Sequence, residues 1–203
     1  MATATHEIVI ATRNPDKGRE ISAILGGLGV HVRTLAEFPA APDVVEDGAT
    51  CEANAVKKAV SAARHTGLTA IADDTGLMVD MLSGRPGVYA ARYAGEHATY
   101  EDNWRKLLRE LDGVPKALRT ARFITVAAIA TPSGGKPDVV EGVLDGLITE
   151  QPAGDRGFGY DPVFFVPELN RTLAQLTPDE KNRISHRARA FTKVREILSR
   201  RQF

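Results

Sequence analysis

Apolar residues along this chain alternate between strand spacing and helix spacing, and this pattern limits the folds that it can adopt. Residues 7–11 form a short apolar run typical of a buried strand. Residues 21–28 carry apolar side chains at helical spacing, and Gly26, Gly27 and Gly29 are expected to stop this helix. Residues 122–130 and 139–148 are long runs rich in β-formers, and a capping-box helix start follows at residues 177–180. The alternation predicts an α/β fold around a mixed β-sheet with flanking helices.

Charge and composition exclude several classes of function. The 203 residues carry 26 Lys and Arg against 26 Asp and Glu, so there is no net positive field to hold a nucleic-acid backbone. No apolar run approaches the roughly 20 residues that span a bilayer, and the start of the chain, MATATHEIVIAT, lacks the pattern of a secretory signal peptide. The single cysteine, Cys51, excludes an intramolecular disulfide and is typical of a reducing compartment. We therefore expect a cytoplasmic protein without nucleic-acid or membrane partners.

The stretch AIADDTGLMVD, residues 70–80, places two adjacent aspartates after a short apolar run. Asp-Thr-Gly is ordinary turn chemistry, but it is also the tripeptide of aspartic proteases, and an acidic pair at a strand end is typical of a magnesium site. We expect the strand to end at this pair. Because neighbouring side chains of an extended backbone point to opposite faces, one carboxylate is expected to do the chemistry while the other orients it or bonds the backbone.

A polar loop after the first strand, TRNPDK at residues 12–17, is a candidate anion site. Backbone N–H groups and the positive end of the dipole favour anions at a helix N-terminus, and Lys17 adds a full charge. The GxxxxGK[ST] pattern of a P-loop is absent. The alternative is that Asn14 and its neighbours only cap the helix and that Lys17 is solvated, and the loop by itself does not decide between the two.

Three further segments carry residues suited to nucleotide chemistry. Glu46, in VEDG, could act with Asp74 only if the fold brings the two together. GFGYDPVFF has two glycines that allow close backbone approach, and Phe158 and Tyr160 offer ring faces for a base. DEKNRISHRARA clusters donors suited to phosphate or to a purine carbonyl. The alternatives are a surface acid, a turn before a core strand, and a solvated basic helix. Taken together, the segments are those needed for a nucleoside triphosphate with magnesium.

Five ordered blocks, TxNxxK, EDGATCEANAVKKA, ADDTGLMVDMLSGRPGVYAARYAG, GFGYDPVFF and LTPDEKNRISHRARA, resemble the inosine triphosphate pyrophosphatase family from Ile8 to about Leu198. The resemblance implies one domain over residues 1–203, with an elongated two-lobed α/β fold, a nucleotide cleft between the lobes, and a homodimer. It also implies Mg²⁺-dependent hydrolysis of the non-standard purine nucleotides ITP, dITP and XTP to the monophosphate and pyrophosphate, which cleanses the nucleotide pool.

The resemblance also implies roles for particular residues. Asp74 would be the catalytic acid–base residue and, with Glu46, a magnesium ligand. Lys58 matches a phosphate-facing lysine, although Lys57 stands beside it. Relatives often have Glu-Asn-Ala where this chain has Ala-Asn-Ala at residues 53–55, which affects only a local helix contact. The residues expected to bind the substrate are Thr12, Arg13, Asn14, Pro15, Asp16, Lys17, Thr75, Phe158, Gly159, Tyr160, Asp161, Lys181, His186 and Arg187.

Selectivity for hypoxanthine and xanthine over adenine has a simple physical form. A donor aimed at the six-position of the purine binds a carbonyl oxygen, but it faces the amino group of adenine donor to donor and leaves a buried group unpaired. His186 and Arg187 are the candidates for this donor.

Other classes of function fit the sequence less well. An aspartic protease needs two Asp-Thr-Gly copies or a small all-β protomer, whereas this helix-containing chain has one copy. A phosphatase with an aspartyl-phosphate intermediate would carry Asp-x-Asp rather than adjacent aspartates. A related pyrophosphatase family that acts on modified pyrimidines lacks the SHR block. The non-enzyme alternative is a regulator that binds ITP without releasing pyrophosphate.

Overall fold

The computed structural model describes residues 6–201. The first five residues of the N-terminal stretch considered above lie outside the described residues. Within residues 6–201, no helix has the length and apolar character needed to cross a membrane. The strands are β1 (Glu7–Ile10), β2 (His31–Thr34), β3 (Thr69–Val79), β4 (Pro86–Gly87), β5 (Thr120–Ala130), β6 (Asp138–Ile148), β7 (Phe164–Val166) and β8 (Arg171–Thr172). The α-helices are α1 (Pro15–Leu25), α2 (Cys51–Thr66), α3 (Tyr100–Glu110), α4 (Pro178–Ile184) and α5 (His186–Arg200).

The described strands form a mixed sheet, which confirms the predicted fold class. Their order is β2-β1-β3-β5-β6-β7-β8, with β4 paired to β3 outside this path. β1 runs parallel to β2 and to β3, with Ile8 opposite Val32 and Thr69. The pairs β3–β4, β6–β7 and β7–β8 are antiparallel. The parallel pairs need crossover helices, and these are α1 and α2.

Local sequence signals account for the bounds of α1. The Asn14 side chain caps the helix by accepting from the backbone N–H groups of Asp16 and Lys17, and Pro15 occupies the first helical position, where no N–H is needed. The helix ends at Leu25, before the glycines that follow it, as the sequence predicts. The positions of Lys17 and of its neighbours in the loop therefore follow from the cap.

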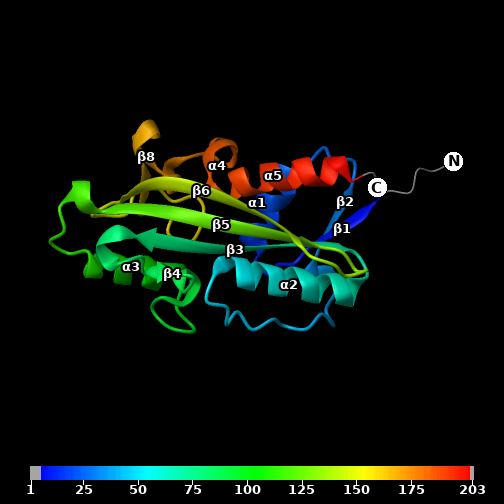
Figure 1. The fold of residues 1–203 in the computed structure, drawn as a ribbon. Coiled ribbons are helices and arrows are strands. Elements are labelled where there is room, and N and C mark those ends of the chain that lie inside the picture. Colours follow the sequence, from blue (N-terminus) through cyan, green and yellow to red (C-terminus); the bar gives the residue numbers. More distant parts are fainter. Residues whose placement is uncertain (1–5, 202–203) are drawn as a thin grey trace. The chain divides into compact units, whose positions relative to one another are not determined.

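The chain forms two compact units, each with its own core. Unit 1 consists of the described parts of Met1–Asp74, Thr125–Gly142 and Arg187–Phe203, and unit 2 consists of Thr75–Ile124 and Val143–His186. In unit 1, α1 and α5 pack on one face of the strands, and α2 covers the other face (Figure 1). Buried side chains of the α1 and α5 face are Ile8, Ile10, Ile21, Leu25, Ile71, Ala127, Ile129, Ala190, Phe191, Val194 and Leu198. In unit 2, residues of α3, β5, β6 and β7 pack around Leu77, Leu107, Phe123 and Phe164.

The structure corrects the prediction that a strand ends at the aspartate pair. β3 continues through Asp73 and Asp74 to Val79, so Asp-Thr-Gly forms no turn here. The turn signal is local, whereas the strand is held by its pairing with β1 before the aspartates and with β4 after them. The two carboxylates consequently lie inside a buried strand. The capping-box start at residues 177–180 is followed by two helices, α4 and α5, because the backbone of Ser185 between them is extended.

Gly146 in β6 has no room for a side chain. A Cβ at this position would lie 2.5 Å from the carbonyl oxygen of Phe165 and 2.6 Å from the ring of Phe164. We expect Gly146→Ala to lower the free energy of unfolding by about 1–3 kcal/mol, measured by denaturant unfolding, because the sheet must move to accept a methyl group. Gly18→Ala in α1 is the control, since nothing lies within 4 Å of the added Cβ there, and it should stabilise the helix by about 0.5–1 kcal/mol. Equal stability of Gly146→Ala and the wild type would contradict the close approach.

Candidate active site

The loop between β1 and α1 is tightly held by its own backbone and side chains. Asn14 N–H donates to Thr12 Oγ1 at 3.1 Å, while Asn14 Oδ1 accepts from the N–H groups of Asp16 at 2.9 Å and Lys17 at 3.3 Å. The capping function that the sequence left open is therefore real. The cap occupies these two N–H groups, and residues 12–17 also carry two cationic side chains, Arg13 and Lys17.

Two other residues of this loop point to protein partners. Arg13 donates to Asp43 Oδ1 at 3.0 Å and to the carbonyl oxygen of Ala41 at 2.6 Å, which ties the loop to the segment preceding Glu46. Asp16 forms an ion pair with Arg19 on the surface of α1. Most polar side chains of residues 12–17 thus hold the loop in place or pair on the surface, and Lys17 has different partners.

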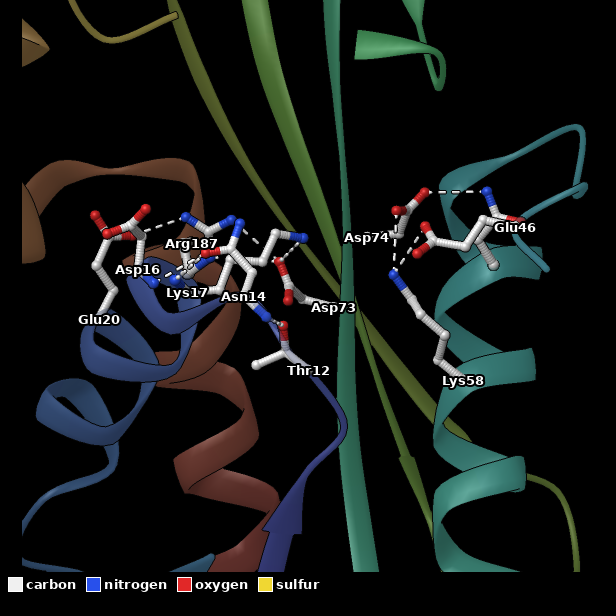
Figure 2. Close-up of polar contacts among 11 residues, drawn as sticks. Thr12, Asn14, Asp16, Lys17, Glu20, Glu46, Lys58, Asp73, Asp74 and Arg187 are labelled. Atoms are coloured by element: carbon white, nitrogen blue, oxygen red, sulfur yellow. Dashed lines mark hydrogen bonds and ion pairs between the residues drawn. The ribbon is translucent and has the colours of Figure 1, made fainter. Parts of the chain in front are cut away.

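Lys17 and Arg187 converge on Asp73. Lys17 Nζ lies 3.2 Å from Asp73 Oδ2, and Arg187 Nη2 lies 3.1 Å from the same oxygen. Arg187 also contacts Glu20 Oε2 through Nη1 at 2.7 Å. Asp73 and Arg187 are each 2% exposed. Figure 2 shows this cluster on the side of β3 that carries α1 and α5. The guanidinium group of Arg187, which the sequence assigned to the purine carbonyl, is anchored here by two carboxylates.

The charge of Asp73 depends on these cations. Burial alone would raise the pKa of the Asp73 carboxyl, but the positive charges of Lys17, Arg187 and Lys58 hold it well below its ordinary value. Burial also lowers the pKa of the Lys17 ammonium. Asp73 is therefore ionised throughout the physiological pH range.

Asp74 lies on the opposite side of β3 and faces α2 (Figure 2). Lys58 Nζ lies 3.3 Å from Asp74 Oδ1 and 3.1 Å from Glu46 Oε2, so one ammonium joins the two carboxylates. The neighbouring Lys57 is directed away, to Asp47 at 2.7 Å. The structure therefore answers which of the two adjacent lysines faces the acids. It also brings Glu46 to Asp74 by way of Lys58.

Glu46 and Asp74 supply hard oxygen donors of the kind that divalent cations take. The Lys58 ammonium lies between the two carboxylates and pairs with both. Among residues 6–201, no cluster of three or more His, Cys, Asp and Glu forms a metal site. One or two protein carboxylates are sufficient for Mg²⁺ when substrate phosphates provide further ligands. Glu46 and Asp74 therefore fit a metal ion that binds together with a phosphorylated substrate.

A second set of the sequence-predicted residues gathers within unit 2 around Asp161. Its Oδ2 accepts from Phe158 N–H at 2.9 Å and forms an ion pair with Lys181 Nζ. The Lys181 ammonium also lies 4.8 Å from the centre of the Phe158 ring. Gly157 has a φ of 72°, and a Cβ there would meet Asp161 Oδ2 at 2.0 Å, so this turn requires glycine. The turn and the lysine are thus held by one carboxylate.

The aromatic residues of this second set differ in their surroundings. Phe158 is partly exposed and lies 5.8 Å from the ring of Tyr100. Tyr160 is a core residue, and its hydroxyl donates to the carbonyl oxygen of Ala90 at 2.8 Å. The His186 ring stacks on Phe123 at 4.3 Å. Of the two rings that the sequence offered to a base, Phe158 is therefore the accessible one.

The comparisons with known proteins decide the family. The model of the Ham1 family matches residues 8–197. The chain belongs to the Ham1 family. This agrees with the resemblance inferred from the five sequence blocks. The chain is 56% identical to the dITP/XTP pyrophosphatase of Geobacillus kaustophilus, over 94% of this chain and 93% of that protein. It is 52% identical to the dITP/XTP pyrophosphatase of Geobacter sulfurreducens, over 94% and 96% of the two chains.

Solved structures of Ham1-family proteins have the same fold. The HAM1 protein of Coxiella burnetii superposes with a TM-score of 0.87 at 40% identity, covering 97% of this chain and all of that chain (100%). The Staphylococcus aureus Ham1 protein gives a TM-score of 0.85 at 40% identity, with coverage of 97% and 100%.

Sequence reasoning missed two polar residues of this Ham1-family chain, one that contacts Arg187 and one that contacts Asp74. Glu20 forms an ion pair with Arg187, and Asn54 donates to Asp74 Oδ2 at 3.3 Å. The signal for Asn54 was available, because an asparagine inside an otherwise alanine-rich helix is unfavourable without a partner. Cys51 is buried and burial raises the pKa of its thiol to about 12, so it is an inert side chain.

Asp73→Asn should destabilise unit 1 by about 3–5 kcal/mol at neutral pH, because Lys17 and Arg187 lose a buried partner. A carboxyl whose pKa is lowered by folding stabilises the protein above its unfolded pKa, near 4, and loses this contribution as the pH falls toward the folded pKa. The difference in the free energy of unfolding between wild type and Asp73→Asn should therefore be constant above about pH 5 and shrink below about pH 4.

Asp43→Asn is the matched control for this series. Asp43 pairs with Arg13, but its side chain is exposed, so its loss should change stability by less than about 1 kcal/mol. Urea unfolding at several pH values measures both variants. A pH-independent difference for Asp73→Asn, or one no larger than that of Asp43→Asn, would contradict the buried network.

Proposed function

We propose that this Ham1-family chain is a magnesium-dependent nucleoside triphosphate pyrophosphatase that hydrolyses ITP, dITP and XTP to the monophosphate and pyrophosphate, removing them from the nucleotide pool. The proposal is that it does so in the cytoplasm as a homodimer. The observation that carries it is the pair of carboxylates, Glu46 and Asp74, gathered around Lys58 in the same unit as Lys17. The names of the relatives, dITP/XTP pyrophosphatases, support the same substrate class.

In this proposal each charged group has a defined task. Glu46 and Asp74 would hold Mg²⁺, which when bound offsets the phosphate charge and helps to hold the substrate. The water oxygen attacks the α-phosphorus while Asp74 accepts a proton from the water; the new oxygen–phosphorus bond replaces the bond from the α-phosphorus to the bridging oxygen, and pyrophosphate leaves with that oxygen. Lys17 and Lys58 stabilise the negative charge that develops on the phosphates. Asp73 holds Lys17 in place through its 3.2 Å contact.

The second set of residues, together with Arg187, is proposed to contact the base. Phe158 offers its ring face, and Lys181, held by Asp161, offers a cation beside it. His186 and Arg187 are the proposed donors for the six-carbonyl, with the Arg187 guanidinium fixed by Asp73 and Glu20. An adenine amino group would face these donors without an acceptor, which disfavours ATP.

The product distribution tests this proposal. Phosphorus NMR of the protein incubated with Mg²⁺ and with ITP, dITP, XTP or ATP should show the monophosphate and pyrophosphate, with ATP the poorest substrate. Chelation of the metal should stop the reaction. Formation of the diphosphate and orthophosphate would contradict the proposed reaction, and tight binding of ITP without turnover would favour a non-catalytic nucleotide-binding protein.

Asp74→Asn should reduce turnover of ITP by roughly two orders of magnitude or more, because the variant loses its acid–base group. Asp145→Asn is a suitable control and should retain wild-type activity. Asp145 is an exposed acid on β6, and its ion pair with Arg122 is long, at 3.9 Å. Thermal unfolding followed by circular dichroism verifies that both variants are folded. A folded Asp74→Asn variant with near wild-type turnover would overturn the role of Asp74.

A further inference from the structure

Asn54 is a buried polar side chain on α2 that has no task in the proposed reaction. It is 1% exposed, and buried alanines such as Ala55 and Ala59 surround it on the helix. Asparagine is disfavoured inside helices because its side chain competes for backbone hydrogen bonds, and a buried amide without partners destabilises the fold. The contacts made by this side chain therefore indicate what it contributes.

The two ends of the Asn54 amide contact one candidate metal ligand, Asp74, and the loop that carries the other, Glu46. Oδ1 accepts from the backbone N–H of Gly48 at 2.8 Å, and Nδ2 donates to Asp74 Oδ2 at 3.3 Å. The partners fix the orientation of the amide, since a backbone N–H can only donate and an ionised carboxylate can only accept. Gly48 follows Glu46 by two residues. The Asn54 side chain thus links Asp74 on β3 to the loop that carries Glu46.

Neighbouring residues further restrict the positions of Asp74 and of the Gly48 backbone. Lys58, one helical turn after Asn54, contacts the other oxygen of Asp74, Oδ1, at 3.3 Å. Lys58 and Asn54, both on α2, therefore contact different oxygens of the carboxylate. A Cβ on Gly48 would lie 2.5 Å from Asn54 Oδ1, so the loop approaches the amide as closely as a glycine allows.

We propose that Asn54 is a positioning residue that holds Asp74 and the Glu46 loop at the separation required by a divalent cation. The inference rests on the magnesium site of the proposed function. Asn54 does not coordinate the ion. It acts on the ligands, because hydrogen bonds to ligating carboxylates orient them, and removing such a partner weakens metal affinity by about 10–100-fold.

Asn54→Leu tests the proposal, since it removes both hydrogen bonds while keeping the number and branching of the side-chain heavy atoms. The chain offers a matched control in Asn103 of α3, which is 2% exposed. Its Oδ1 accepts from Ala94 N–H at 2.8 Å, and its Nδ2 donates to the carbonyl oxygen of Ala91 at 3.1 Å. Asn103→Leu therefore removes two part-buried hydrogen bonds that join α3 to residues 91–94 in unit 2. A general loss of stability would affect both variants alike.

The readout is the affinity for Mn²⁺, which takes the same oxygen ligands as Mg²⁺. Electron paramagnetic resonance of the free ion follows titrations of each protein, alone and with α,β-methylene ITP, whose α–β link cannot be hydrolysed. We expect the Kd for Mn²⁺ to rise about 10–100-fold in Asn54→Leu and to stay at the wild-type value in Asn103→Leu. Circular dichroism at the titration temperature establishes that each variant is folded.

Gly48→Ala provides a second variant in case Asn54→Leu does not fold. It keeps Asn54 but forces the loop away from the amide, and it should also weaken Mn²⁺ binding. Wild-type affinity in folded Asn54→Leu or in Gly48→Ala, or an equal loss in Asn103→Leu, would overturn the inference alone. A wild-type protein that binds no Mn²⁺ in either titration would overturn the metal site of the proposed function and the inference with it.

Discussion

Two adjacent carboxylates lie inside the buried strand β3, and the need to balance their charges determines much of unit 1. Asp73 is 2% exposed and Asp74 is 6% exposed. Ionised carboxylates are tolerated at such positions only when they are paired and hydrogen-bonded. Because successive side chains of a strand point to opposite faces, the two aspartates form their direct ion pairs with different cations. Each face of β3 therefore has its own basic partners.

On the face of α1 and α5, the partners of Asp73 come from distant parts of the sequence. Arg187 is 114 residues from Asp73 and 167 residues from Glu20, yet it contacts both. The network joins α1, β3 and α5 once the sheet and its helices are assembled. A buried ion pair adds little net stability, but removing one partner is strongly destabilising, because a charge is left without compensation in the interior. This arrangement gives Lys17 a fixed position in the first turn of α1, at the end of the loop that follows β1.

On the face of α2, small side chains allow a helix to lie close to the strand. The buried positions of α2 are mostly alanines, and this close approach lets the short amide of Asn54 and the longer chain of Lys58 both reach Asp74. Lys58 also holds Glu46, and Asn54 also holds the backbone of Gly48. The loop with Glu46 is thus positioned by the same helix that positions Asp74. The two acids are held together although 28 residues separate them in the sequence (74 − 46).

The sequence by itself determined the local elements and the family. The Asn14 cap, the glycines after Leu25 and the long runs of β5 and β6 are encoded within a few neighbouring residues, so α1 and these strands were predicted. Motif blocks likewise identified the family, because their order and spacing are read directly from the chain. Tertiary structure decided that β3 continues through Asp73 and Asp74, and which face each of them occupies. Pairing with β1 and β4 sets the course and register of β3, and these partners are distant in sequence, so a local Asp-Thr-Gly signal could not reveal them.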